Sequence, residues 1–342
     1  MQFYIFVNKY HVMEASIFAI RLHEARLMMG LSMEQLSEKT SRTVTKQSIS
    51  KYEKGQMKPK KGTLNALSAA LDISPQYFSG TNMKINTPML RNAFKKELPS
   101  EEDMKRIESQ LAFWSEQYIE AEKKAKMEIQ FVNPISDRLI ATIDDACRAA
   151  DDLRLAWNCG DGPIPSVLRL MERKGIKVLD KHLPLGVLGM STWADNRYPL
   201  VIIDMANEKH TVERLRFTAA HELGHIMLNI PEEIEGQEKE KLCEQFAGYF
   251  LLPKSTLIEE LGSDKRQSVT IEELIDLHEV YGVSIAALVH ELWDFRIISR
   301  EQYDWWYDER IKKTRKEVGW GQYLFPETIG REKRTKSIID KI

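Results

Sequence analysis

Two histidines and a glutamate stand inside an otherwise apolar helix, and this motif constrains the chain more than any other. The run over residues 216–230 is predicted to form one helix. It contains His221, Glu222 and His225 in the pattern HExxH. Positions i and i+4 share one face of a helix, so both imidazoles can bind one metal ion. Because such groups are costly to bury unpaired, the motif predicts a metal site.

Glu222 follows the first histidine and is expected to project beside the ion. A carboxylate there can take a proton from metal-bound water and pass it to a leaving amine. A purely structural site has no need of this base, so the motif favours a hydrolytic centre. We expect one zinc ion per chain, and the same ligands also accept manganese or iron.

A catalytic zinc has three protein ligands as a rule. The next predicted helix, 238–252, offers Glu240 and Glu244 one turn apart. Its string EKLCE resembles the ExxxD form of gluzincins, in which the first acid binds the metal and the second orients a ligand histidine. The resemblance implies Glu240 as the third ligand and Glu244 as the orienting group, and the reverse assignment stays open. Cys243 is expected in the core, and His210 is a weaker ligand candidate.

Composition limits the class of protein that surrounds this motif. The 342 residues are 43% hydrophobic and 29% charged, which is typical of a globular chain of about two or three domains. No stretch reaches the roughly 18 apolar residues of a membrane span, and the apolar start lacks the flanks of a secretory signal. Three cysteines without a CxxC pair indicate reduced thiols. We therefore expect a cytoplasmic protein with no membrane partner, starting at Met1 or Met13.

Charge divides the chain into a basic and an acidic part. Residues 1–87 carry 12 Lys and Arg against 6 Asp and Glu, whereas the remainder carries 37 against 45. Eight of the basic residues fall within 39–61, where a single glutamate accompanies them. Such a cluster on a small unit is the footprint of a polyanion-binding surface. A solvated loop face is the alternative that charge alone leaves open.

The same N-terminal part is predicted to fold as five short helices. Apolar periodicity and capping residues place them at about 16–29, 32–39, 46–54, 63–71 and 75–78. The run over 31–78 resembles the XRE/Cro-type helix-turn-helix family. The resemblance is carried by Leu36 and Ile49 at core positions and by Glu53-Lys54-Gly55 at the end of the third helix.

This resemblance implies that the third helix enters the major groove of a double-stranded DNA operator. Its N-terminal side chains are the candidate base and phosphate contacts: Thr45, Lys46, Gln47, Ser48, Ser50 and Lys51. A helical protein–protein module that has lost DNA binding is the alternative.

A long helix is expected after Ser100, beyond a linker-like stretch at 82–98. Its apolar residues alternate three and four apart: Met104, Ile107, Leu111, Trp114, Tyr118, Ala121 and Ala125. One interpretation is a coiled coil that makes a homodimer, which would suit a palindromic DNA site. The other is a connector packed on its own chain, which the shortness of the seam favours slightly.

The C-terminal half carries the second resemblance. RFTAAHELGHIML at 216–228, EKEKLCEQFAGYFLLP at 238–253 and the runs at 162–178 and 188–207 are similar to the ImmA/IrrE-type metallopeptidase family. The similarity spans 137–295 and implies zinc-dependent endopeptidase activity, usually against a repressor or antitoxin-like protein. Fusion to an XRE-type domain is familiar in that family, and Glu244 departs from the residues that relatives often carry.

Substrate peptide is expected along an exposed strand edge beside the metal. Short strands are predicted at 176–179, 186–191 and 200–203. Ser191, at the end of the second of these strands, and Trp193, just beyond it, are candidates for lining that cleft. Two further helices at 270–295 are expected to pack in the same domain, with a second DNA-binding pair as the alternative.

Together these patterns predict a mainly α fold with a small β-sheet, of the α+β class. We expect a five-helix helix-turn-helix bundle at 13–80, a linker and long helix at 81–130, a zincin-like metallopeptidase domain at 131–296 and a helical extension at 297–342. The expected function is a DNA-binding regulator that cleaves a repressor or antitoxin-like protein. The alternative is a transcriptional regulator whose metal domain is structural or senses zinc.

Overall fold

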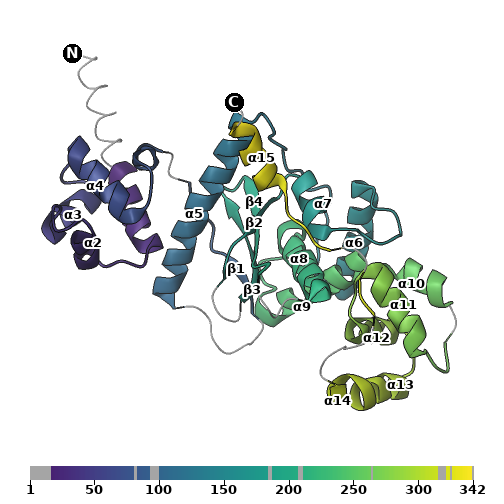
Figure 1. Cartoon of the computed structure of the whole chain (residues 1–342). Coiled ribbons are helices and arrows are strands. Elements are labelled where there is room, and N and C mark those ends of the chain that lie inside the picture. The colour runs from purple at the N-terminus through teal and green to yellow at the C-terminus, as the bar shows by residue number, and fades with distance from the viewer. Residues whose placement is uncertain are drawn as a thin grey trace. The chain divides into compact units, whose positions relative to one another are not determined.

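The computed structural model describes residues 17–80, 83–92, 100–183, 187–206, 211–262, 265–314, 321–323 and 326–340 (Figure 1). Contacts within the chain group it into two compact units. The first comprises Met1–Thr87, Glu97–Glu120 and Ala194–Asn196, and the second comprises Pro88–Lys96, Ala121–Trp193 and Arg197–Ile342. Met13 and His210 lie outside the described residues.

Short helices build the N-terminal part of the first unit. They are a helix over 17–28, α2 (Met33–Lys39), α3 (Lys46–Glu53), α4 (Lys61–Leu71) and the 3-10 helix η1 (Pro75–Ser79). Ser32 and Gln35 form a reciprocal capping box at the start of α2. The Thr45 hydroxyl accepts a hydrogen bond from the Ser48 N–H at the start of α3. These caps fix where the helices begin, as the sequence predicts.

An apolar core joins the short helices, and its centre is formed by fully buried side chains: Leu22, Leu36, Ile49, Leu67 and Leu71. The Arg26 guanidinium donates hydrogen bonds of 2.6 and 2.8 Å to Glu53. Burial opposes the charged form of Glu53, but the hydrogen bonds from Arg26 and His23 outweigh it and lower the pKa of that carboxyl. This ion pair ties the first helix to the end of α3.

The long helix expected after Ser100 is α5 (Glu101–Lys124). Ile107, Leu111 and Tyr118 of its apolar seam are buried within the single chain. The other four seam residues are half-buried: Met104, Trp114, Ala121 and Ala125. The burial of Ile107, Leu111 and Tyr118 agrees with the connector interpretation, and the homodimer stays a prediction.

The second unit contains a four-stranded sheet in the order β1-β3-β4-β2. β1 (Met89–Asn92) pairs antiparallel with β3 (Val187–Ala194), and β2 (Lys177–Asp180) pairs parallel with β4 (Tyr198–Ile203). The sequence predicts β2, β3 and β4. It does not predict β1, which falls in the stretch interpreted as a linker.

Helices accompany this sheet and complete the mainly α fold, which confirms the predicted fold class (Figure 1). They are α6 (Ile143–Trp157), α7 (Val167–Arg173), α8 (Val212–Met227), α9 (Gly236–Leu251), α10 (Lys254–Leu261), α11 (Ile271–Tyr281), α12 (Ile285–Asp294), α13 (Arg300–Trp305), the π-helical turn η2 (Trp306–Ile311), α14 (Lys312–Thr314) and α15 (Arg331–Ile339). In the part of the chain that the structure describes, no helix is long and apolar enough to cross a membrane.

α11 and α12 contribute to the core of the second unit through buried leucines: Leu274, Leu277, Leu288 and Leu292. The same core contains Leu223 of α8 and Phe246 of α9. This packing favours the interpretation of 270–295 as part of the C-terminal domain over a second DNA-binding pair.

α8 and α9 approach closely at Gly224. A Cβ at this position would lie 3.2 Å from Cδ1 of Phe246 and 3.3 Å from Cβ of Cys243. Contacts of that kind are tighter than most packed cores tolerate. The glycine in the motif therefore lets α9 lie directly against the helix that bears the two histidines.

A buried ion pair fastens the C-terminal segment to the second unit. The Glu327 carboxylate accepts hydrogen bonds from the Val167 and Leu168 N–H groups at the start of α7. It also accepts a 2.8 Å hydrogen bond from the Arg216 guanidinium on α8, and both paired side chains are fully buried. Because Arg216 lies five residues before His221, Glu327 helps to position α8.

Glu327→Gln is expected to lower the free energy of unfolding by about 3–5 kcal/mol, because it leaves the Arg216 charge buried without a counter-charge. Urea denaturation followed by circular dichroism measures this loss. Glu332→Gln is the matched control, since its pair with Lys181 is partly exposed, and it should cost less than about 1 kcal/mol. Equal, small losses in the two variants would contradict the stabilising role of Glu327.

Candidate metal centre

The HExxH residues lie on α8, and Glu240 reaches them from α9. The His221, Glu222 and His225 side chains are buried, and the Glu240 side chain is 43% exposed. The Nε2 atom of His221 lies 3.1 Å from Oε2 of Glu240 and 3.1 Å from Nε2 of His225. The Nε2 atom of His225 lies 3.3 Å from Oε1 of Glu240. Three metal-ligating side chains thus converge on one point.

The spacing of these ligand atoms fits a tetrahedral zinc ion. Zinc bonds of about 2.0–2.1 Å in a tetrahedron place neighbouring ligand atoms about 3.3 Å apart. The observed separations are 3.1, 3.1 and 3.3 Å. Within the described ranges, His221, His225 and Glu240 are the one group of three such residues close enough to hold an ion.

The electrostatics of the cluster favour positive charge. Burial opposes the charged form of His225, but hydrogen bonding to Cys243 and Glu240 outweighs it and raises the pKa of His225 to about 10. Burial also opposes the charged form of Glu240, but hydrogen bonds from His221 and His225 hold the pKa of that carboxyl well below its usual range. A divalent cation can replace the protons that these groups share.

β3 holds the carboxylate of Glu222. The Ser191 hydroxyl donates a 2.6 Å hydrogen bond to Oε2 of Glu222. Gly189, two residues earlier on β3, leaves room for the close approach of α8, because a Cβ there would lie 2.6 Å from Cγ2 of Thr218 and 3.3 Å from Cγ of Glu222. The candidate base is therefore fixed between the sheet and its own helix.

The two candidate cleft residues have different positions. Ser191 is 1% exposed and faces Glu222, so it contacts the candidate base without lining an open surface. Trp193 is half-buried, and its ring packs edge-on against Phe131 with centroids 5.6 Å apart.

Cys243 is the residue of α9 that contacts the far side of a candidate ligand histidine. Its Sγ atom lies 3.4 Å from Nδ1 of His225, so Cys243 contacts the ring nitrogen that faces away from Glu240. Glu244 is exposed on α9, and the described residues show no hydrogen bond between it and either histidine. Cys243 follows Glu240 by three residues, a spacing that keeps both side chains on the face of α9 toward α8. That helical spacing is the signal that could have identified Cys243.

The candidate DNA contacts lie at the start of α3 and along its outer face. They are exposed or half-exposed: Thr45, Lys46, Gln47, Ser48, Ser50 and Lys51. Ile49 and Tyr52 are buried in the core, which turns the polar side chains outward. The Thr45 hydroxyl caps α3 and lies 3.0 Å from the Ser48 hydroxyl. Thr45 and Ser48 therefore shape the start of the helix in addition to facing solvent.

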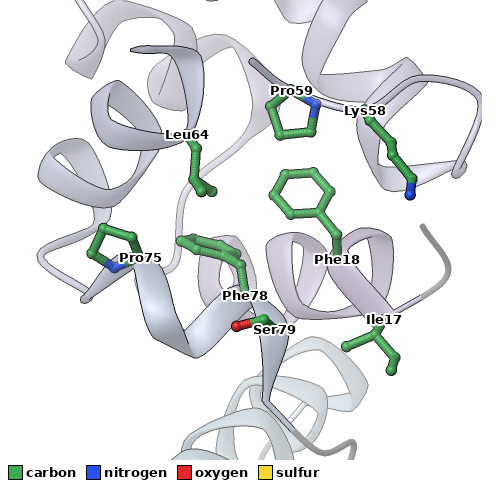
Figure 2. A pocket seen from close by; sticks show the side chains of 8 residues that line it. All are labelled: Ile17, Phe18, Lys58, Pro59, Leu64, Pro75, Phe78 and Ser79. Atoms are coloured by element: carbon green, nitrogen blue, oxygen red, sulfur yellow. The ribbon is translucent and has the colours of Figure 1, made fainter. Parts of the chain in front are cut away.

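An apolar pocket of about 360 Å³ also lies in the first unit. Figure 2 shows Phe18 and Phe78 facing it between Pro59, Leu64 and Pro75. The two phenylalanine rings are 5.6 Å apart at their centroids. Lys58 is the one charged side chain among its lining residues. The pocket lacks the paired acids, bases or metal ligands that a reaction site needs.

Two family models match the chain. Residues 22–78 match the helix-turn-helix model, and residues 171–292 match the IrrE N-terminal-like domain of the M78 peptidases. No curated protein is similar enough to count as a match. Both resemblances seen in the sequence are confirmed: residues 22–78 are similar to helix-turn-helix domains, and residues 171–292 are similar to a domain of metallopeptidase type.

Proposed function

We propose that this chain is a DNA-binding regulator whose C-terminal domain is a zinc-dependent endopeptidase. The observation that supports it most is the convergence of His221, His225 and Glu240 at tetrahedral spacing, with Glu222 next to His221 on α8. Glu222 lies outside this ligand set and is held by Ser191. A site that only stores or senses zinc does not require an additional oriented carboxylate.

In this proposal His221, His225 and Glu240 hold the zinc ion. Zinc supplies a Lewis acid that polarises the peptide carbonyl and lowers the pKa of a bound water to about 7. Glu222 accepts a proton from the attacking water and delivers it to the nitrogen of the leaving amine. The Ser191 hydroxyl keeps the Glu222 carboxylate in one orientation through both transfers.

Cys243 positions a ligand. Its sulfur contacts Nδ1 of His225, which leaves Nε2 directed at Glu240 and the shared ligand point. Neighbours of this kind fix the ring orientation of metal-binding histidines. We assign this positioning role to Cys243 in place of Glu244.

The proposed substrate is a repressor or antitoxin-like protein, and the proposed place of action is the cytoplasm, where operator DNA is present. The support is the match of 171–292 to the IrrE N-terminal-like domain and its fusion to the helix-turn-helix domain.

We further propose that α3 reads an operator in the major groove. Lys46 and Gln47 are exposed at the N-terminal end of α3, where such helices reach base edges. Exposed lysines follow α3 at Lys58, Lys60 and Lys61 and are the proposed phosphate contacts.

Glu222→Gln is expected to keep one zinc per chain and to lower cleavage at least about 100-fold, because it removes the general base but no ligand. Metal content by mass spectrometry and cleavage of co-expressed candidate repressors measure both effects. Glu240→Gln should lose zinc, and Glu244→Gln, one turn further along α9, is the control that keeps zinc and cleavage.

Wild-type protein with less than one tightly bound divalent metal per chain would contradict the metal site. Equal cleavage by wild type and Glu222→Gln would remove Glu222 from the reaction. Zinc in both proteins with cleavage by neither would favour the regulator whose metal domain is structural or senses zinc.

Replacing Lys46 and Gln47 together with alanine should weaken binding to an operator, selected from a random DNA library, by about 1–3 kcal/mol. Replacing Lys58 and Lys60 should weaken binding to all sequences and reduce the salt slope by about two. Fluorescence anisotropy across a salt series measures both. Lys105→Ala, in an exposed pair with Glu101 on α5, is the control. Wild-type affinity in the first double variant for every selected operator would refute the role of α3.

A further inference from the structure

The strand that faces Glu222 has no free edge. β3 brings Gly189 and Ser191 against α8, and β4 lies along one of its sides. β1 lies along the other side, antiparallel, with Met89 opposite Ser191 and Arg91 opposite Gly189. The edge that the sequence expects a substrate peptide to use is therefore filled by the chain itself.

The pairing continues beyond β1 along the same strand. Ile85 forms an antiparallel bridge with Ala194. The Lys84 N–H donates a 2.8 Å hydrogen bond to a carboxylate oxygen of Asp195, and the Asp195 N–H donates one of 2.8 Å to the Lys84 carbonyl. Residues 84–92 thus run antiparallel to β3 and the turn after it, and the register shifts by one residue between the Ile85–Ala194 bridge and the Met89–Ser191 pair.

An extended peptide binds a protein most simply by adding a strand to a sheet edge, where main-chain hydrogen bonds supply the affinity. The outer edge of β1 is one strand spacing, about 4.7–4.9 Å, further from β3 and its contacts with Glu222. A peptide that is to lie directly beside Ser191 therefore has to take the place of β1.

We propose that residues 84–92 occupy the peptide-docking edge of the candidate peptidase and block it until they are displaced. This proposal rests on the proposed function. The occupant is a segment of the same chain, situated between the two matched domains and outside both. A strand on a short flexible tether competes with free peptides at an effective concentration in the millimolar range. A free peptide at ordinary concentration therefore does not displace it from the edge of β3.

The pairing of β1 is short enough to be reversible. β1 has four residues, follows Pro88, and its register with β3 shifts between Arg91 and Asn92. Proline cannot donate to a strand ladder, and an irregular register removes further hydrogen bonds. Displacing β1 from β3 thus breaks few hydrogen bonds. When no competing peptide is present, the covalent connection to the rest of the chain keeps β1 paired with β3.

The test uses full-length, zinc-loaded Glu222→Gln protein and a fluorescent peptide with the sequence of residues 83–92. Leu90→Pro places a proline, which fits a strand ladder poorly, in the middle of β1 and should release this strand. Hydrogen exchange of the 84–92 amides reports the release directly. We expect the Leu90→Pro variant to bind the peptide at least tenfold more tightly than its parent in fluorescence anisotropy. A scrambled peptide and Glu128→Pro, in an exposed coil, are the controls.

Equal peptide affinity in parent and Leu90→Pro, or no binding by a variant whose amides are released and whose zinc content is unchanged, would overturn the proposal. Casein cleavage is followed on the same variants with Glu222 restored, and release of β1 should raise it at least tenfold. Cleavage that Leu90→Pro leaves unchanged would overturn the blocking role alone. If the Leu90→Pro variant binds the peptide but no variant cleaves casein, the proposal that β1 occupies a peptide-docking edge stands, and the proposed peptidase function is contradicted. Self-cleavage within 84–92 would show that β1 is a substrate, which would overturn the proposal that it blocks the docking edge.

Discussion

The packing of α8 against α9 decides whether a three-ligand site exists in this chain. Two histidines one turn apart supply two ligands from α8, so the third has to come from another element. Gly224 lets α9 approach until the carboxylate of Glu240 lies within 3.3 Å of both imidazoles. The same contact brings Cys243 to Nδ1 of His225. On the other side of α8, the buried Arg216–Glu327 pair fixes the helix to a segment outside the matched domain.

The sheet completes the site from a neighbouring face of α8. Gly189 and Ser191 allow β3 to contact Glu222, so the carboxylate proposed to move protons is held by the sheet, and the third proposed metal ligand comes from α9. Both helix packing and sheet packing depend on a glycine at the point of closest approach. The strand that contacts Glu222 is also the strand with which β1 pairs, so the proposed docking edge and the proposed general base both depend on β3.

Local signals explain what the sequence predicts well. Helix caps such as Ser32 and Thr45 act within a few residues, and the spacing of His221 and His225 follows from helical geometry alone. Two features depend on tertiary context. The resemblance implies Glu244 as the group that orients a histidine, and the structure places Cys243 of α9 against Nδ1 of His225. β1 is a four-residue strand after a proline without a periodic signal, and only its pairing with β3 defines it.

X-ray absorption spectroscopy of the zinc-loaded protein identifies the atoms bound to the metal. We expect two imidazole nitrogens and carboxylate oxygen at about 2.0–2.1 Å, with no sulfur scatterer. A zinc–sulfur shell at about 2.3 Å would contradict this expectation, since Cys243 would then be a ligand and the metal centre would differ from the one formed by His221, His225 and Glu240.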